Sequence, residues 1–189
     1  GDWDRHPYEE DTVPKYKDWK ESVTENQEYS WVKAPTFQGE PAQVGPLAHV
    51  LCMVAAGHEG AAKYVTETLK TVSALVGSEV GVGALHSTIG RIAARSVRCA
   101  ILNDTMQDQF NALMENIGKG DLTTFNPPDL SKSGTYQGFG CHEAPRGILS
   151  HWVVIEGGKI KNYQAVVPST WNAGPRNSKD DLGPYEASL

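Results

Sequence analysis

Two strand-forming runs joined by a pair of glycines constrain the fold more than any other feature of this sequence. The runs "ILSHWVVIE" and "KIKNYQAVV" are rich in β-branched and aromatic residues, and Gly157-Gly158 lies between them. Such a pair favours a two-residue β-turn, because the turn requires positive φ angles that glycine adopts without strain. The sequence therefore predicts a β-hairpin with strands over about 148–156 and 159–167.

The register of this hairpin brings two distant motifs together. If the glycine pair forms the whole turn, Glu156 faces Lys159, and apolar and aromatic residues meet across the strands further out. The same register places Arg146, of "APRG", opposite Ser169, of "VPSTWN". A one-residue bulge in either strand would break this pairing. We therefore predict a corner at the open end of the hairpin that contains Arg146 and Ser169.

This corner would be stiff and rich in hydrogen-bond donors. Pro145 and Pro168 restrict the backbone on its two sides. Arg146 carries a guanidinium that stays protonated at ordinary pH, while Ser169 and Thr170 carry hydroxyls. Such donors suit an anionic ligand or a strong hydrogen-bond acceptor. On spacing alone, an arginine near a strand end more often forms a surface ion pair than a binding site.

Residues 46–118 have the spacing of long helices. Apolar residues recur at helical intervals from Pro46 to Gly77, with an interruption over 57–60. A second helical pattern begins at Ser87 or Thr88 and ends at Gly118, which corresponds to about 45 Å of continuous helix. Helices of this length usually belong to a bundle. Together with the hairpin, they predict the α+β fold class.

The remaining regions predict irregular structure within a single domain. Residues 1–45 are aromatic and proline-rich, so we expect an irregular segment that packs against something larger. Residues 119–147 are rich in turn-forming residues and predict loops. Residues 148–189 comprise the hairpin and C-terminal loops.

Composition and charge narrow the classes of partner. The net charge of −6 and the pI near 5.5 argue against nucleic acid as a partner. No apolar run reaches the length of a transmembrane helix, so we expect no transmembrane segment. Cys52, Cys99 and Cys141 are far apart and form no C-x-x-C pair. They predict buried free thiols in place of a metal site or a disulfide.

Other charged and polar side chains allow more than one interpretation. Arg91, Arg95 and Arg98 share one helix face, which indicates a solvated or ion-paired face or, alternatively, an interaction surface. Glu143 beside the corner could pair with a nearby arginine, or relay protons if burial raises its pKa. We expect His151, within the first strand, to be hydrogen-bonded inside the protein.

Several motifs, taken in order along the chain, resemble the large subunit of nickel–iron hydrogenases. The resemblance covers nearly the whole sequence and includes the ending "GPYEASL". Its most specific motifs are the two that form the predicted corner. The matching motifs are "YSWVKAP" (29–35), "VGPLA" (44–48), "STIGRIAAR" (87–95), "EAPRGILSHW" (143–152) and "GKIKNYQAVVPSTWNAGPR" (158–176).

The resemblance implies the reversible oxidation of H₂ to protons and electrons at a Ni–Fe centre whose iron carries CO and CN⁻. It places Arg146 over the metals and makes Arg146 and Ser169 hydrogen-bond donors to the cyanides. The surrounding pocket would include Pro145, Pro168, Thr170 and Glu143. The backbone carbonyl of Ala165 would bind Mg²⁺ or a similar ion.

The departures from the family pattern concern the metal ligands. The two C-x-x-C motifs that hold nickel and iron are absent from this sequence, so we expect no Ni or Fe ligand in this chain. Thr36, Gln43 and His49 replace residues usual in the family, which puts a local ion-pair network in doubt. Both ends of the sequence fall inside the usual family chain, so we expect a middle-to-late segment of the large subunit.

The resemblance also implies partners and a location. We expect the remaining large-subunit segments, with their C-x-x-C motifs, and a small subunit that carries iron–sulfur clusters. The motifs look most like uptake-type enzymes exported with their small subunit, which predicts a periplasmic or membrane-associated location. The alternative is a non-catalytic descendant that serves as a scaffold in an electron-transfer complex. Retention of both "APRG" and "VPSTW" argues against that alternative.

Overall fold

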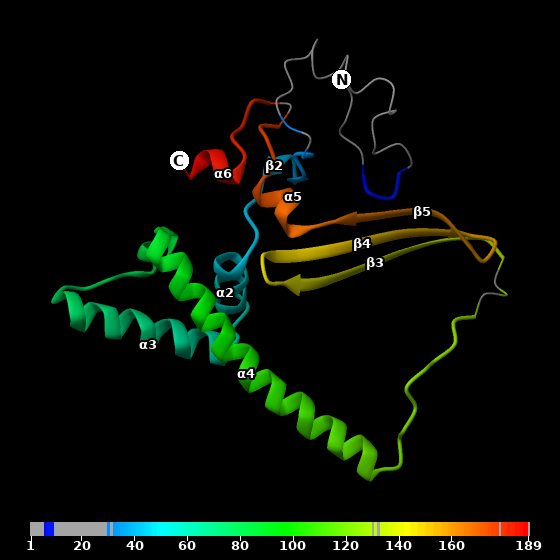
Figure 1. The fold of residues 1–189 in the computed structure, drawn as a ribbon, viewed down its shortest axis with the longest axis horizontal. Coiled ribbons are helices and arrows are strands. Elements are labelled where there is room, and N and C mark those ends of the chain that lie inside the picture. Colours follow the sequence, from blue (N-terminus) through cyan, green and yellow to red (C-terminus); the bar gives the residue numbers. More distant parts are fainter. Residues whose placement is uncertain are drawn as a thin grey trace. The chain divides into compact units, whose positions relative to one another are not determined.

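The computed structural model describes residues 6–9, 30, 32–129, 131, 133–177 and 179–188 (Figure 1). Helices and small antiparallel sheets make up these residues, which confirms the predicted α+β class. Two compact units divide the chain: one joins Gly1–Gly45 to Asp129–Leu189, and the other is Pro46–Pro128. Each unit is described separately.

The helical unit contains the two predicted helical regions. The first is α2 (Pro46–Ala55) and α3 (Glu59–Val76), separated at Gly57, whose φ is +80°. The second is α4 (Thr88–Gly118), which follows the short 3-10 helix η1 (Val82–His86). Each predicted helical region is therefore confirmed, including the interruption in the first.

Side chains and a glycine fix the ends of these helices. The Ser87 hydroxyl accepts a hydrogen bond from Gly90 N at 3.1 Å, which confirms Ser87 as the N-cap of α4. His58 caps α3, because its Nδ1 accepts from Ala61 N at 3.1 Å. Gly77 ends α3 with a φ of +72°, the left-handed conformation that glycine adopts at low cost.

The core of this unit lies where α2, α3, η1 and the first half of α4 meet. Tyr64 on α3 also donates a hydrogen bond from its hydroxyl to Asp104 on α4 at 2.8 Å. The second half of α4 leaves large apolar side chains exposed. The buried cluster is Leu47, Val50, Ala61, Val65, Leu85, Ala94, Val97 and Ile101. The exposed apolar side chains of the second half are Met106, Phe110, Leu113, Met114 and Ile117.

Two expectations about polar residues need correction. Arg98 is only 6% exposed, so the solvated alternative for the arginine face is wrong at this position, whereas the ion-paired alternative stays a prediction. Arg91 instead bonds locally, from its Nε to His86 O at 3.2 Å. The three cysteines are free thiols, but all three are exposed, so their predicted burial is also wrong. None of the helices in the described ranges combines the length and apolar character needed to cross a membrane.

The other unit contains a three-stranded antiparallel sheet in the order β3-β4-β5 (Figure 1). Its strands are β3 (Thr135–Ala144), β4 (Gly147–Glu156) and β5 (Lys159–Val166). The predicted hairpin is therefore confirmed to within one residue at each strand end. The prediction of loops over 119–147 is wrong for β3. Glycines within this edge strand weaken the alternating pattern by which a strand is identified.

A bulge changes the predicted hairpin register. Next to the turn, Glu156 pairs with Lys159 as predicted. The register then shifts between Val154 and Ile155, and the ladder ends where Ser150 pairs with Val166. Beyond that point the chain enters the short helix α5 (Pro168–Asn172), so the predicted strand pairing of Arg146 with Ser169 is wrong. A bulge depends on local packing, and the composition of the two runs does not reveal it.

Shorter elements complete this unit. The region predicted to be irregular, 1–45, contains the two-residue strands β1 (Thr36–Phe37) and β2 (Glu40–Pro41). Near the C-terminus, α6 (Pro184–Ala187) forms one further helical turn. Residues 6–9 contact the sheet, because Asn162 Nδ2 on β5 donates to Pro7 O at 3.3 Å and to Glu9 O at 3.0 Å.

The contact between η1 and α4 depends on Gly90. A Cβ at this position would lie 2.7 Å from the carbonyl carbon of Leu85 and closer still to Ala84 O. We predict that Gly90→Ala lowers the free energy of unfolding by about 1–3 kcal/mol or more, because backbone atoms cannot move aside as a side chain can. Urea unfolding followed by circular dichroism measures this loss.

Gly118 is the matched control on the same helix. A Cβ at this position meets no atom within 4 Å. We therefore expect Gly118→Ala to be neutral or stabilising by up to about 1 kcal/mol, since alanine favours helix. Equal effects of the two substitutions would contradict the proposed close contact at Gly90.

Candidate functional site

Arg146 occupies a tight turn between β3 and β4. Ala144 pairs with Gly147, so Pro145 and Arg146 are the only two residues between the paired positions. Proline fixes φ at the first of them, which is consistent with the predicted stiff presentation of Arg146. The Arg146 residue is exposed.

Within the described residues, the guanidinium of Arg146 has neither an ion pair nor a hydrogen bond. The surface ion pair that the sequence left open is therefore not found in this part of the chain. An exposed guanidinium keeps its full set of five N–H donors for another acceptor.

The side-chain amide of Asn172 joins the Arg146 turn to two other segments. Its Nδ2 donates to Arg146 O at 3.1 Å, and its Oδ1 accepts from Val44 N at 3.0 Å. Asn172 is the last residue of α5, so one side chain connects α5, the β3–β4 turn and the segment before α2. Sequence reasoning missed this residue, because an asparagine after "VPSTW" carries no spacing signal for a contact with residues so far away in sequence.

Two glycines allow these segments to approach. Gly147 has a φ of +132°, and a Cβ there would lie 2.6 Å from Val44 Cγ2. Gly45 has a φ of +134°, and a Cβ there would lie 3.3 Å from Arg146 O. Both the positive φ and the lack of room for a Cβ therefore favour glycine at these positions. We call Val44, Gly45, Arg146, Gly147 and Asn172 the Arg146 corner.

Ser169 reaches the same neighbourhood through α5. It lies three residues before Asn172, and residues three apart share a helix face with their Cβ atoms about 5–6 Å apart. The bond from Asn172 to Arg146 O therefore brings the face that carries Ser169 to the β3–β4 turn. The predicted nearness of Ser169 to Arg146 stays a prediction, and α5, not strand pairing, is the element that would bring it about. Pro168, the first residue of α5, is buried, and Thr170 is half-buried.

The other predicted site residues lie on the sheet. Glu143 is half-buried on β3, opposite Ile148 and near the turn. Ala165 on β5 pairs with His151. The Nδ1 of His151 is hydrogen-bonded to the hydroxyl of Tyr163, which confirms the expectation of an internal partner. The roles predicted for Glu143 and Ala165 stay predictions.

The donors of Arg146 and Ser169 suit an anion and do not suit a metal ion. Arginine offers only N–H donors, and a neutral serine hydroxyl is a poor ligand for a soft metal. Across the described ranges, no group of three or more His, Cys, Asp and Glu side chains could hold a metal ion. The arrangement can therefore bind a negatively charged or strongly accepting group through fixed donors.

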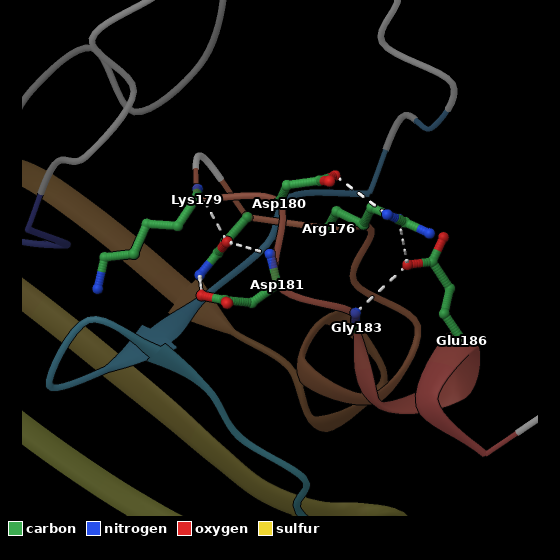
Figure 2. A network of polar contacts seen from close by, with 7 residues as sticks. Arg176, Lys179, Asp180, Asp181, Gly183 and Glu186 are labelled. Carbon is green, nitrogen blue, oxygen red and sulfur yellow. Dashed lines mark hydrogen bonds and ion pairs between the residues drawn. The ribbon is translucent and has the colours of Figure 1, made fainter.

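A polar network near the C-terminus stabilises the segment that follows α5 (Figure 2). Arg176 Nη1 pairs with Asp180 Oδ1 at 3.1 Å, and Arg176 Nε lies 3.7 Å from Glu186 Oε2. The same carboxylate accepts from Gly183 N at 3.3 Å. Beside them, the Asn177 amide bonds to both the backbone and the carboxylate of Asp181. Single exposed pairs of this kind contribute little, and the network gains from their combination.

This segment also contacts the chain before Val44. A Cβ on Gly174 would lie 3.2 Å from Lys33 O, so the two backbones are in close contact. Lys179 Nζ donates to Gly39 O at 3.1 Å and lies 3.3 Å from Glu40 Oε1. These contacts tie the residues after α5 to the strand that leads to Val44. The chain that leads to Val44 is therefore anchored independently of the Asn172 amide.

The strain at Gly147 gives a testable consequence. We predict that Gly147→Ala destabilises the sheet unit more than Gly157→Ala does. Alanine at either position adopts an unfavourable positive φ, at a cost of about 1–2 kcal/mol. At Gly147 the new methyl also overlaps Val44, which adds about 1–3 kcal/mol, whereas at Gly157 no atom lies within 4 Å. Parallel urea titrations measure the difference, and equal losses would refute the close approach.

Comparison with known proteins identifies the family. The family described as nickel-dependent hydrogenase matches residues 1–189. The hydrogenase-2 large chain of Escherichia coli (strain K12) is 51% identical over 183 residues, which cover 97% of this chain and 32% of that protein. The quinone-reactive Ni/Fe-hydrogenase large chain of Wolinella succinogenes is 40% identical over 198 residues, covering 97% of this chain and 33% of that protein.

A solved structure agrees with these matches. The Ni-Fe-Se hydrogenase from D. vulgaris Hildenborough in the reduced state superposes with a TM-score of 0.61 and 27% sequence identity, over 85% of this chain and 32% of that one. The chain thus spans 32–33% of the length of these relatives. It belongs to the nickel-dependent hydrogenase family and corresponds to a segment of the large chain.

Proposed function

We propose that this chain forms one wall of a Ni–Fe centre in a hydrogenase that interconverts H₂ with protons and electrons. The observation that carries the proposal is the Arg146 guanidinium, which is presented by a two-residue turn and has no partner within the described residues. In a member of the nickel-dependent hydrogenase family, such a charge fits an anionic ligand of the metal centre. Catalysis belongs to the complete large chain with its partners.

The donor chemistry of the Arg146 corner fits the ligands of the iron better than the metals themselves. Cyanide on iron is a charged acceptor, and both a guanidinium and a hydroxyl donate to such a group. Arg146 and Ser169 would therefore hold the two cyanides. The nickel and iron would be bound by cysteines of the two C-x-x-C motifs outside this chain. When bound, the Ni–Fe centre supplies the redox chemistry and the binding of hydrogen.

The residues of this chain would orient the ligands of the centre and polarise the bound substrate. Arg146 would provide a fixed positive charge at the centre, and such preorganised charge stabilises charge that develops in a transition state. Pro145 and Pro168 keep the walls of the pocket rigid and exclude water, and Thr170 provides a second hydroxyl. Glu143 either relays protons or pairs with an arginine. The carbonyl of Ala165 would bind Mg²⁺.

The partners and the location follow from the same proposal. The remaining large-chain segments would complete the pocket, and a small subunit with iron–sulfur clusters would remove the electrons. A relative named as quinone-reactive supports a periplasmic or membrane-associated location, because quinones reside in the lipid phase. A non-catalytic scaffold is the alternative, and no contact within the described residues favours it.

Metal analysis of the assembled enzyme tests the proposal against the scaffold alternative. We expect the complete large chain, purified with its partner subunit, to contain nickel and iron and to show infrared bands of metal-bound CO and CN⁻. An assembled complex without nickel and without these bands would show that the chain is part of a scaffold.

Arg146→Lys tests the role of the guanidinium. We predict that turnover per bound nickel falls by about 10²-fold or more, since lysine lacks the planar fork and can lose its proton in a dry site. Nickel content should stay unchanged, because Arg146 is not a ligand. The matched control is Arg91→Lys, which alters only a local bond to His86 O on another unit. Unchanged turnover in Arg146→Lys would remove Arg146 from the mechanism.

A further inference from the structure

We propose that Asn172 is the positioning residue of Arg146: its amide fixes the β3–β4 turn so that the guanidinium is held against the metal centre. The inference rests on the proposed function and adds a residue to it. Asn172 has no direct contact with a reacting group in this account. It acts through the backbone of Arg146.

The two bonds of the Asn172 amide determine its orientation. The amide nitrogen donates to Arg146 O, and the amide oxygen accepts from Val44 N. Rotating the amide by 180° would place oxygen against oxygen and N–H against N–H, so only one orientation satisfies both partners. The two distances, 3.1 and 3.0 Å, are ordinary for hydrogen bonds. The position of the turn is thus defined relative to Val44 and α5.

The Arg146 side chain depends on this backbone anchor. Within the described residues the guanidinium has no partner to hold it, so its position follows from the turn that carries it. A functional group must be held within about 0.5 Å and 10–20° of its productive geometry. A displacement of about 1 Å can reduce turnover by about 10²-fold. A small movement of the turn therefore has a large effect on the position of the guanidinium.

The two glycines of the Arg146 corner allow close approach but supply no side-chain contact to the turn. Gly147 and Gly45 prevent clashes with Val44 and with Arg146 O, but a glycine has no side chain with which to hold its neighbour. The Asn172 amide supplies a directional hydrogen bond to the backbone of Arg146. The contacts of Lys179 and Gly174 with residues 33–40 keep the far side of this link in place.

Asn162 provides a matched control. Its Nδ2 also donates to two backbone carbonyls in the same unit, those of Pro7 and Glu9. It pairs with Val154, eight residues along β4 from Arg146, which corresponds to about 26 Å of extended strand. Asn162→Ala therefore removes comparable hydrogen bonds without touching the Arg146 turn.

The experiment compares Asn172→Asp, Asn172→Ala and Asn162→Ala in the complete large chain assembled with its partner subunit. The aspartate variant keeps the acceptor for Val44 N but replaces the donor to Arg146 O with a carboxylate oxygen. We expect both Asn172 variants to retain nickel and to lose about 10–100-fold in kcat per bound nickel, with a smaller change in KM for H₂. The infrared CN⁻ bands should shift, because the guanidinium donates less well to cyanide. Asn162→Ala should change neither kcat per bound nickel nor the CN⁻ bands.

A double-mutant cycle tests whether Asn172 acts through Arg146. If it does, Asn172→Asp should reduce kcat per nickel far less in the Arg146→Lys background than in the wild type. Fully additive losses would show that Asn172 acts by another route, and would overturn the proposal.

Further outcomes would also contradict the positioning role of Asn172. Unshifted CN⁻ bands with a kcat per nickel equal to that of Asn162→Ala would show that the amide positions nothing. Failure of both Asn172 variants to assemble with nickel, while Asn162→Ala assembles, would show a purely structural residue. Absence of nickel and of CN⁻ bands from the wild type would instead refute the proposed function, and the positioning role with it.

Discussion

The arrangement of the candidate site depends on one side-chain amide that satisfies two backbone groups from distant parts of the sequence. Asn172 bonds to Arg146 O and to Val44 N, which lie 26 and 128 residues away along the chain. The glycines beside them, Gly45 and Gly147, let the backbones approach until one amide can join both. A sheet turn, a short helix and an irregular segment thereby become one structure.

This arrangement explains how an exposed charge can have a defined position. Arg146 has no ionic partner in the described residues, and an unpaired exposed guanidinium is stable because water solvates it. If further segments of a large chain covered the corner, as we propose, that charge would lose water and would require an anion of its own. The chain spans 32% of the hydrogenase-2 large chain, and the exposed apolar side chains in the second half of α4 likewise lack a covering element in the described structure.

Local signals in the sequence predicted local structure, but they did not predict long-range contacts. The glycine pair determined the hairpin turn, and Ser87 and Gly77 marked helix ends, because caps and turns depend on neighbouring residues. The bulge at Val154 shifted the register, so the predicted Arg146–Ser169 strand pairing was wrong, and Ser169 lies on the helix α5 instead. Strand β3, the exposure of the thiols and the role of Asn172 depend on packing, which spacing does not encode.

The central claim is that the Asn172 amide holds the Val44 segment and the Arg146 turn together. Hydrogen exchange of the Val44 amide in the assembled enzyme tests this claim most directly, because Val44 N–H donates to Asn172 Oδ1 and has no strand partner. The account predicts that this amide exchanges orders of magnitude more slowly than an exposed loop amide such as that of Thr123. Exchange of the Val44 amide at the rate of an unprotected loop would contradict it.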